Sequence, residues 1–251
     1  MIDKIPKIIH YCWFGKNPMP KEGIKCIESW KKYCPNYEIK EWNETNFDIN
    51  CCSYVREAYE AKKWAFVSDY ARYKILYDYG GVYLDTDVEL IKSLDKLVEK
   101  GNYMGCENYD HKKMLVNPGL GCASRPGDEL YAEIIDDYEK SSFKNEDGSL
   151  NLYTVVQRTT FFLEKYGLQK STEIQDIKGI TIYPADYFCP IDMRDGRLKI
   201  TNNSYSIHHC AASWAKKSDI YYAKLLRILY RCLGQKGFDV LRKVFGKKNK
   251  E

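Results

Sequence analysis

The chain has 251 residues, of which 44% are hydrophobic and 29% are charged, and its formal net charge is +4. These are the proportions of a globular protein with room for one large domain, so they exclude disordered and fibrous classes. A charge of +4 over 251 residues is also too weak for a typical nucleic-acid binder, and we expect no nucleic-acid partner.

Apolar or alternating segments and amphipathic segments follow one another along the first third of the chain. The expected strands cover residues 5–14, 37–42 and 82–84, and the expected helices cover residues 21–33, 53–63 and 64–79. Gly80 and Gly81 should end the last of these helices and lead the chain directly into the third strand.

The rest of the body repeats this alternation less regularly. The expected strands cover residues 103–106, 119–123, 180–183 and 205–209, and the expected helices cover residues 129–140 and 153–166. Such a long alternation of the two element types predicts an α/β fold with a mostly parallel central sheet flanked by helices.

The last 36 residues, 216–251, differ from the body in charge. They carry 11 Lys and Arg against three acidic residues, a net +8, whereas residues 1–215 carry 28 against 32, a net −4. Within this tail, Lys224, Arg227 and Arg231 share one face of a helix expected over 221–233. We therefore predict a catalytic body and a basic helical tail. The tail could dock on an anionic membrane surface or pack on the body with a solvated basic face.

Ten cysteines are scattered along the chain, and no two of them have the CxxC spacing of a zinc ribbon. We expect them to act as small buried hydrophobes in a reducing compartment. The first residues lack the apolar core of a signal peptide, and no apolar stretch is long enough to span a membrane. The expected location is the cytoplasm, with peripheral attachment to the inner face of the plasma membrane as an option for the tail.

Two carboxylates follow the short strand at 82–84. If that strand continues through Asp85 and Asp87, their side chains share one face, and if a loop begins there, both can converge on one ion. Carboxylate oxygens suit Mg²⁺ or Mn²⁺, and such an ion would neutralise a departing diphosphate. On the preceding helix, Asp69 and Arg72 lie one turn apart. They could form a surface salt bridge of well under ~1 kcal/mol, or bind the sugar and phosphate of a donor.

Three segments of the chain together resemble glycosyltransferase family 32: IPKIIHYCWFG, AFVSDYARYKILYDYGGVYLDTDVEL and IHHCAASW. This family contains enzymes of capsular-polysaccharide synthesis and yeast mannosyltransferases, and clostridial glucosylating toxins have a related core. The resemblance implies a type-A glycosyltransferase (GT-A) fold with a Rossmann-like sheet. It also implies a nucleotide-sugar donor, a divalent Mn²⁺ or Mg²⁺ ion, and retention of configuration at the anomeric carbon.

The resemblance assigns roles to the residues at matching positions. Trp13 matches the aromatic that stacks on the nucleotide base, and Asp69 and Arg72 match contacts to the donor sugar and phosphate. Asp85 matches a carboxylate that contacts ribose or sugar and helps to hold the metal. Asp87 matches the direct metal ligand.

The later segments add further candidates. His208 matches a second metal ligand, for which His209 is a weaker candidate, and Ser213 and Trp214 match groups that close over the diphosphate. Asn117 matches the floor of the site near the anomeric carbon, although an Asn before a proline is also a common turn former.

On the acceptor side the match is incomplete. The family's TGP-like segment should fall near residues 153–155, where Gly and Pro are missing, so no role is carried over from it. Asp186 lies in a stretch that resembles a late family motif, and it is a candidate acceptor contact.

The function expected from the sequence is hexose transfer from a nucleotide sugar to a glycan acceptor, in bacterial surface-polysaccharide synthesis. UDP-hexose is favoured over GDP-mannose as the donor, and the basic tail suits a lipid-linked acceptor. Two alternatives stay open. A haloacid-dehalogenase-like phosphatase also has a DxD after a strand, but Glu89 stands where it needs Thr or Val. A non-catalytic sugar-binding module would have no need of an intact Asp85, Asp87, His208 and Trp214.

Overall fold

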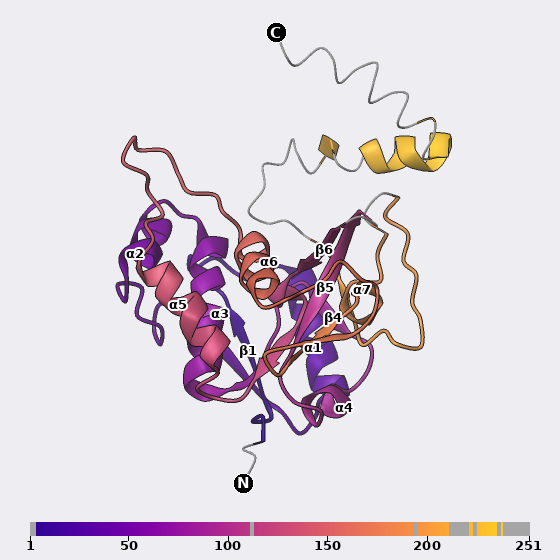
Figure 1. Ribbon diagram of the computed structural model, residues 1–251, viewed down its shortest axis with the longest axis horizontal. Coiled ribbons are helices and arrows are strands. Elements are labelled where there is room, and N and C mark those ends of the chain that lie inside the picture. The colour runs from indigo at the N-terminus through magenta and orange to yellow at the C-terminus, as the bar shows by residue number, and fades with distance from the viewer. Residues whose placement is uncertain are drawn as a thin grey trace.

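The computed structural model describes residues 4–110, 113–192, 195–210, 221–222, 225–234 and 237. Its centre is an eight-stranded sheet with the strand order β2-β1-β3-β7-β5-β9-β8, and β6 pairs with β5 beside this path (Figure 1). The strands are β1 Ile8–Cys12, β2 Glu38–Trp42, β3 Gly81–Tyr83, β5 Tyr103–Asp110, β6 Lys113–Val116, β7 Cys122–Ser124, β8 Gln175–Ile177 and β9 Ile180–Tyr183. A second sheet of two strands joins β4 Val88–Leu90 to β10 Ser206–His208.

The large sheet is mixed but mostly parallel. β1 pairs in parallel with β2 and β3, and β5 pairs in parallel with β9. β7 lies antiparallel between β3 and β5, so β1, β2, β3, β5 and β9 all run in one direction. β6 and β8 run in the other direction, like β7. The α/β fold expected from the sequence is therefore confirmed.

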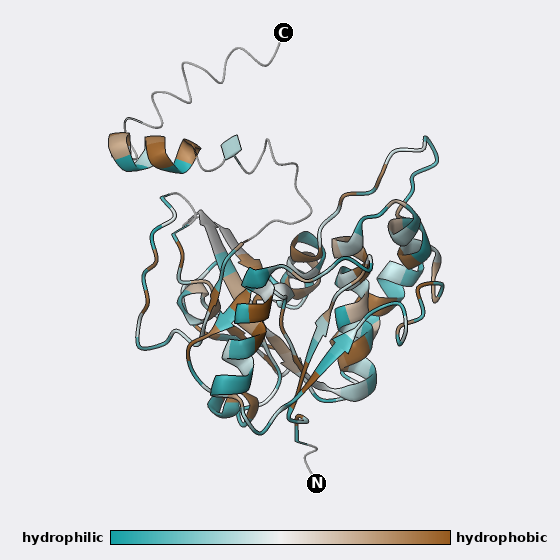
Figure 2. Cartoon of the chain, turned by 180° about the vertical axis from the view of Figure 1, so that it is seen from behind, coloured by the Kyte–Doolittle hydropathy of each residue, from teal (hydrophilic) through white to brown (hydrophobic). Residues whose placement is uncertain are grey.

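Helices cover both faces of this sheet (Figure 1). The helices are α1 Lys21–Tyr33, α2 Ser53–Glu60, α3 Trp64–Tyr79, α4 Asp95–Val98, α5 Glu129–Glu139, α6 Val155–Lys165 and α7 Ala185–Phe188. One core cluster joins α2, α3, α5 and α6 to the sheet, and a second cluster joins α1, α4 and α7 to it. In Figure 2 the outer loops are mostly hydrophilic, as expected when the apolar side chains lie between the layers.

Two expected strands differ from the structure. The segment expected as a strand over 119–123 begins with a 3₁₀ turn, η1 Pro118–Leu120, and becomes strand only at Cys122. The turn forms because the Asn117 side chain accepts a hydrogen bond from the amide of Gly119 and the chain continues into Pro118. The strand expected over 205–209 pairs with β4 instead of joining the large sheet.

The described part of the tail is helical at 221–222 and 225–234. Arg231 donates a hydrogen bond to the carbonyl of Asp195, and the helix shows both apolar and polar turns in Figure 2. No helix in the described part of the chain combines the length and the apolarity needed to cross a bilayer. The division of the chain at residue 215 stays a prediction.

Candidate functional site

The site lies where α3 ends and the chain returns through β3. Gly80 caps α3 by donating from its amide to Leu76 O at 2.9 Å, with φ of +65°, a conformation that glycine adopts without strain. β3 then passes between β1 and β7, and the chain leaves it at Leu84. Asp85 and Asp87 lie in the turn that joins β3 to β4. Of the two arrangements that the sequence allowed, a loop is therefore correct and a continued strand is wrong.

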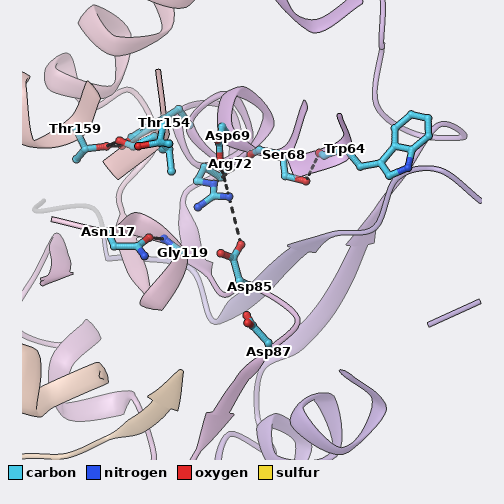
Figure 3. A network of polar contacts seen from close by, with 12 residues as sticks. Trp64, Ser68, Asp69, Arg72, Asp85, Asp87, Asn117, Gly119, Thr154 and Thr159 are labelled. Carbon is cyan, nitrogen blue, oxygen red and sulfur yellow. Dashed lines mark hydrogen bonds and ion pairs between the residues drawn. The ribbon is translucent and has the colours of Figure 1, made fainter. Parts of the chain in front are cut away.

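A buried ion network connects α3 to this turn (Figure 3). Arg72 Nη2 lies 3.0 Å from Asp69 Oδ1 and 3.3 Å from Asp85 Oδ1. The Asp69 and Arg72 side chains are only 10% and 4% exposed, so the surface salt bridge considered for this pair is wrong. Their i, i+3 spacing holds, but the face they share is turned toward the sheet.

Burial and charge compete within this network. Burial raises the pKa of Asp69 to about 6, against the opposing effect of Arg72. Burial would lower the pKa of Arg72, but the nearby Asp85 carboxylate and its neighbours hold it well above the ordinary value. Arg72 therefore stays charged between two carboxylates. Its Nη1 is buried and has no hydrogen-bond partner among the described residues.

His208 reaches the turn from a distant part of the sequence. β10 pairs antiparallel with β4 in a register that sets His208 opposite Val88, next to Asp87. His208 Nε2 lies 3.1 Å from Asp87 Oδ1. Asp85, Asp87 and His208 each offer one ligand atom, and these atoms lie within 4.8 Å of one another. Two carboxylate oxygens and one imidazole nitrogen are a donor set that fits Mn²⁺ or Mg²⁺.

The charge state of His208 depends on its partner. Burial alone would lower the pKa of His208, but the facing Asp87 carboxylate raises it well above the usual value. A metal ion at Nε2 would have to displace this proton, so metal binding and protonation compete at His208.

Asn117 takes the turn-forming role that the sequence left open. Its Oδ1 accepts from Gly119 N at 2.8 Å, and its Nδ2 donates to Glu107 Oε2 at 2.9 Å. Both polar ends of the amide are therefore engaged within the protein. Gly119 lies against Asp85, because a Cβ at this position would overlap the Asp85 carboxylate. The η1 turn therefore packs directly against the Asp85 side chain.

Glu107 is a site-proximal residue that the sequence did not reveal. It lies on β5, half-buried, and burial raises the pKa of its carboxyl. No sequence pattern distinguishes Glu107 from the other acid of β5, Asp110, because the contact with Asn117 arises only from the folded arrangement of the chain.

Trp13 lines a cavity between the end of β1 and α1. The cavity has a volume of about 420 Å³, and its lining includes Trp13, Tyr11, Ile24 and Lys31. Trp13 Nε1 donates to Asn17 O at 2.6 Å, which fixes the plane of the indole. The cavity is linked to the site through α1, since a Cβ on Gly23 would lie 3.5 Å from Thr86 O.

The remaining site residues predicted from the sequence do not belong to the Asp85, Asp87 and His208 cluster in the described part of the chain. His209 is exposed and its Nε2 faces Glu89 Oε2 at 2.9 Å, so it lies outside the ligand cluster. Asp186 accepts hydrogen bonds from the Thr201 and Asn203 side chains, an arrangement that orders a loop. Thr154, in the segment without a carried-over role, caps α6. Ser213 and Trp214 lie outside the described residues, and their roles stay predictions.

Residues 20–104, which include Asp69, Arg72, Asp85 and Asp87, match the family described as "Glycosyltransferase sugar-binding region containing DXD motif". The match is limited to this region, which carries the DXD motif as Asp85 and Asp87. The resemblance to DXD-containing glycosyltransferases that the sequence indicated is therefore confirmed for this region, and the match favours a glycosyltransferase over the phosphatase alternative.

Comparisons with individual proteins agree with the match. Inositol phosphoceramide mannosyltransferase 1 of Schizosaccharomyces pombe is 31% identical over 114 residues, which cover 41% of this chain and 34% of that protein. The chain thus spans about a third of the length of that curated relative. Uncharacterized glycosyltransferase L373 of Acanthamoeba polyphaga mimivirus is 26% identical over 238 residues, which cover 90% of this chain and 88% of that protein.

Among solved structures, the PaToxG glycosyltransferase resembles this one with a TM-score of 0.50 at 17% sequence identity. The likeness covers 64% of this chain and 69% of that one. At this identity the likeness concerns the fold alone, and it confirms the GT-A fold expected from the sequence.

Proposed function

We propose that this glycosyltransferase transfers a hexose from a nucleotide sugar, UDP-linked in preference to GDP-linked, to a hydroxyl group of a glycan acceptor. The observation that carries the proposal is the convergence of Asp85, Asp87 and His208 beside the buried Arg72. Neither a structural core nor a simple sugar lectin needs this combination of a hard-metal donor set and an unpartnered buried guanidinium nitrogen.

In this proposal Asp87 and His208 hold Mn²⁺ or Mg²⁺, with Asp85 as a third ligand. The bound ion would supply charge neutralisation for the departing diphosphate. Arg72 Nη1, which has no partner among the described residues, is available to donate to a phosphate or sugar oxygen. The half-buried Trp13 indole, at the wall of its cavity, would stack on the base.

We propose retention through a front-face displacement. A covalent intermediate needs a carboxylate nucleophile at the anomeric carbon. Asp69 is held by Arg72, and Glu107 by Asn117, while Asp85 and Asp87 belong to the ligand set. The leaving phosphate oxygen is therefore the better candidate to accept the proton of the acceptor hydroxyl.

The acceptor is proposed to be carried on a membrane lipid. The fission-yeast relative is named for mannose transfer to inositol phosphoceramide, which is an anionic lipid. The net charge of +8 on residues 216–251 complements such a surface, and would keep the enzyme on the cytoplasmic face of a membrane. The resemblance of the sequence to capsular-polysaccharide enzymes supports a role in bacterial surface-polysaccharide synthesis.

A thermal-shift panel of nucleotide sugars tests the donor class. A donor present at 100 times its dissociation constant should stabilise the folded state by about 2.7 kcal/mol, and we expect this for a UDP-hexose only when Mn²⁺ or Mg²⁺ is present. Stabilisation by GDP-mannose alone would move the donor assignment to GDP. Equal stabilisation with and without EDTA would contradict the metal. Binding without slow release of free sugar would indicate a sugar-binding module.

A further inference from the structure

A second cluster of ligand atoms lies behind His208. The Cys189 and Cys210 thiols and the His208 ring each offer one ligand atom within 4.8 Å of the others. Cys210 Sγ lies 3.2 Å from His208 Nδ1, the ring nitrogen that faces away from Asp87. This cluster therefore uses the opposite side of the same imidazole.

The three residues are held by packing between separate elements. Cys189 directly follows α7, and His208 and Cys210 lie at the end of β10. The amide of Tyr205 donates to Tyr187 O at 2.7 Å, and Ser206 Oγ donates to Phe188 O at 3.3 Å. These bonds align β10 with α7 and bring the two thiols to the same side.

Cys210, whose thiol faces His208, has an unusual backbone conformation. Its φ is +51°, in the left-handed region that residues with a Cβ rarely occupy. Cys189 is 2% exposed and His208 is 9% exposed, whereas Cys210 is partly exposed, so the cluster lies at the edge of the core. No disulfide joins any of the cysteines in the described part of the chain.

We propose that Cys189, Cys210 and His208 Nδ1 form a binding site for a soft divalent ion such as Zn²⁺. Two thiolates and one imidazole are typical zinc ligands, and three protein ligands leave a fourth position for water. Zn–S distances of about 2.3 Å in a tetrahedron separate the sulfur atoms by about 3.8 Å, within the observed spread of the ligand atoms. Binding releases the two thiol protons, and the Nδ1 proton of a charged His208 ring, to solvent.

A metal ion at this site would change how His208 interacts with Asp87. A neutral imidazole bound to metal through Nδ1 keeps its proton on Nε2 and donates it to the Asp87 carboxylate, a common arrangement around zinc. The same nitrogen is then unavailable to the hard ion of the proposed function. The two sites therefore compete for His208, and Zn²⁺ should inhibit the Mn²⁺-dependent reaction; this consequence rests on the proposed function.

Cobalt substitution tests the thiolate site without any activity assay. Co²⁺ added to the reduced full-length protein should give an intense thiolate-to-metal charge-transfer band and the visible bands of tetrahedral cobalt, at one ion per chain. Cys189→Ser and Cys210→Ser should each weaken binding about tenfold or more. The Cys51→Ser/Cys52→Ser control, which changes the adjacent pair before α2, should keep the band.

Absence of the charge-transfer band in the wild-type protein overturns the proposal, whether or not the variants fold. Wild-type Co²⁺ affinity and band intensity in the Cys189→Ser and Cys210→Ser proteins, or loss of the band only in the control, also overturns it. In a second arm, Zn²⁺ should inhibit Mn²⁺-dependent donor hydrolysis in the wild-type protein, and Cys189→Ser should need about tenfold more Zn²⁺. Loss of the cobalt band with hydrolysis intact rejects this site alone, whereas a cobalt band without hydrolysis rejects the proposed function alone.

Discussion

Asp69 is the residue whose role changes most between sequence and structure. The i, i+3 spacing to Arg72 was visible in the sequence, but spacing alone does not say which face of the helix is buried. The structure encloses α3 on nearly all sides, and only 7% of Asp69 is exposed. A carboxylate that is enclosed in this way must have a paired charge, which Arg72 provides.

This burial predicts a pH dependence of stability. The pKa of Asp69 is about 6 in the folded protein and about 3.9 in an unfolded chain. The folded state therefore binds the proton more tightly. The resulting stabilisation is complete below about pH 4 and is lost as the pH rises through about 6, for a total of about 3 kcal/mol.

Asp69→Asn should remove this fall in stability with rising pH. Urea unfolding of the two proteins between about pH 4 and pH 7 measures it, because the free energy of unfolding of the wild-type protein should fall relative to that of Asp69→Asn as the pH rises. Parallel profiles would show that Asp69 titrates at the same pH in both states.

Gly119 gives a second prediction at the residue scale. In Gly119→Ala the new Cβ overlaps Asp85 Oδ2 and lies 3.0 Å from Arg72 Nη1. The Asp85 side chain is 29% exposed, so it can turn away at little cost in stability. We expect a nearly unchanged melting temperature but turnover reduced about 100-fold, because a catalytic group is displaced by about 1 Å. Wild-type turnover of a folded variant would mean that the position of Asp85 is not critical.

At the scale of elements, helices were predicted better than sheet pairings. α1 and α3 begin and end where the sequence placed them, because their apolar spacing and the Gly80 stop are local signals. β4 and β10 are three residues each, and their pairing joins segments far apart in the chain. No local pattern encodes such a contact, so His208 could be matched to a motif but not placed beside Asp87 from the sequence alone.

The β4 strand is anchored on the other side by α1. Trp30 Nε1 donates to Val88 O at 2.7 Å, and Ser29 Oγ accepts from Leu90 N at 2.9 Å. Both bonds come from one turn of a helix that packs on β4. The position of β4, with which the His208 strand β10 pairs, therefore depends on α1.

Trp30→Phe tests this dependence. The buried carbonyl of Val88 would lose its partner, which should cost about 1–3 kcal/mol in the free energy of unfolding. The Mn²⁺ affinity should fall as well, since β4 begins directly after Asp87. Urea unfolding and Mn²⁺ titration measure the two effects. A loss of stability with unchanged Mn²⁺ affinity would show that the ligand turn is fixed without α1.

At the scale of the whole molecule, the net charge of +4 combines two parts of opposite sign. Removing residues 216–251 takes away a net charge of +8 and leaves a body of −4. Each basic residue near an anionic surface contributes about 1 kcal/mol of attraction. The sequence reveals this asymmetry completely, although it does not say whether the tail contacts a membrane or the body.

Vesicle sedimentation distinguishes these two roles of the tail. The full chain should bind vesicles that contain anionic phospholipid, and added salt should weaken the binding. Deletion of 216–251 should abolish it while donor hydrolysis persists. Equal binding of both proteins, or binding only to neutral vesicles, would contradict the membrane role.

The central claim is that Asp87 holds a divalent ion on which sugar transfer depends. The direct test is donor hydrolysis at saturating Mn²⁺ by the wild-type protein, Asp87→Asn and the matched control Asp78→Asn. Asp78 forms a surface pair with Lys74 on α3, away from the ligand cluster. We predict a loss of roughly 100-fold or more for Asp87→Asn, with wild-type stability in urea and no loss for Asp78→Asn, since even outer-sphere partners of a metal contribute 10–100-fold. Wild-type hydrolysis by folded Asp87→Asn would contradict the account.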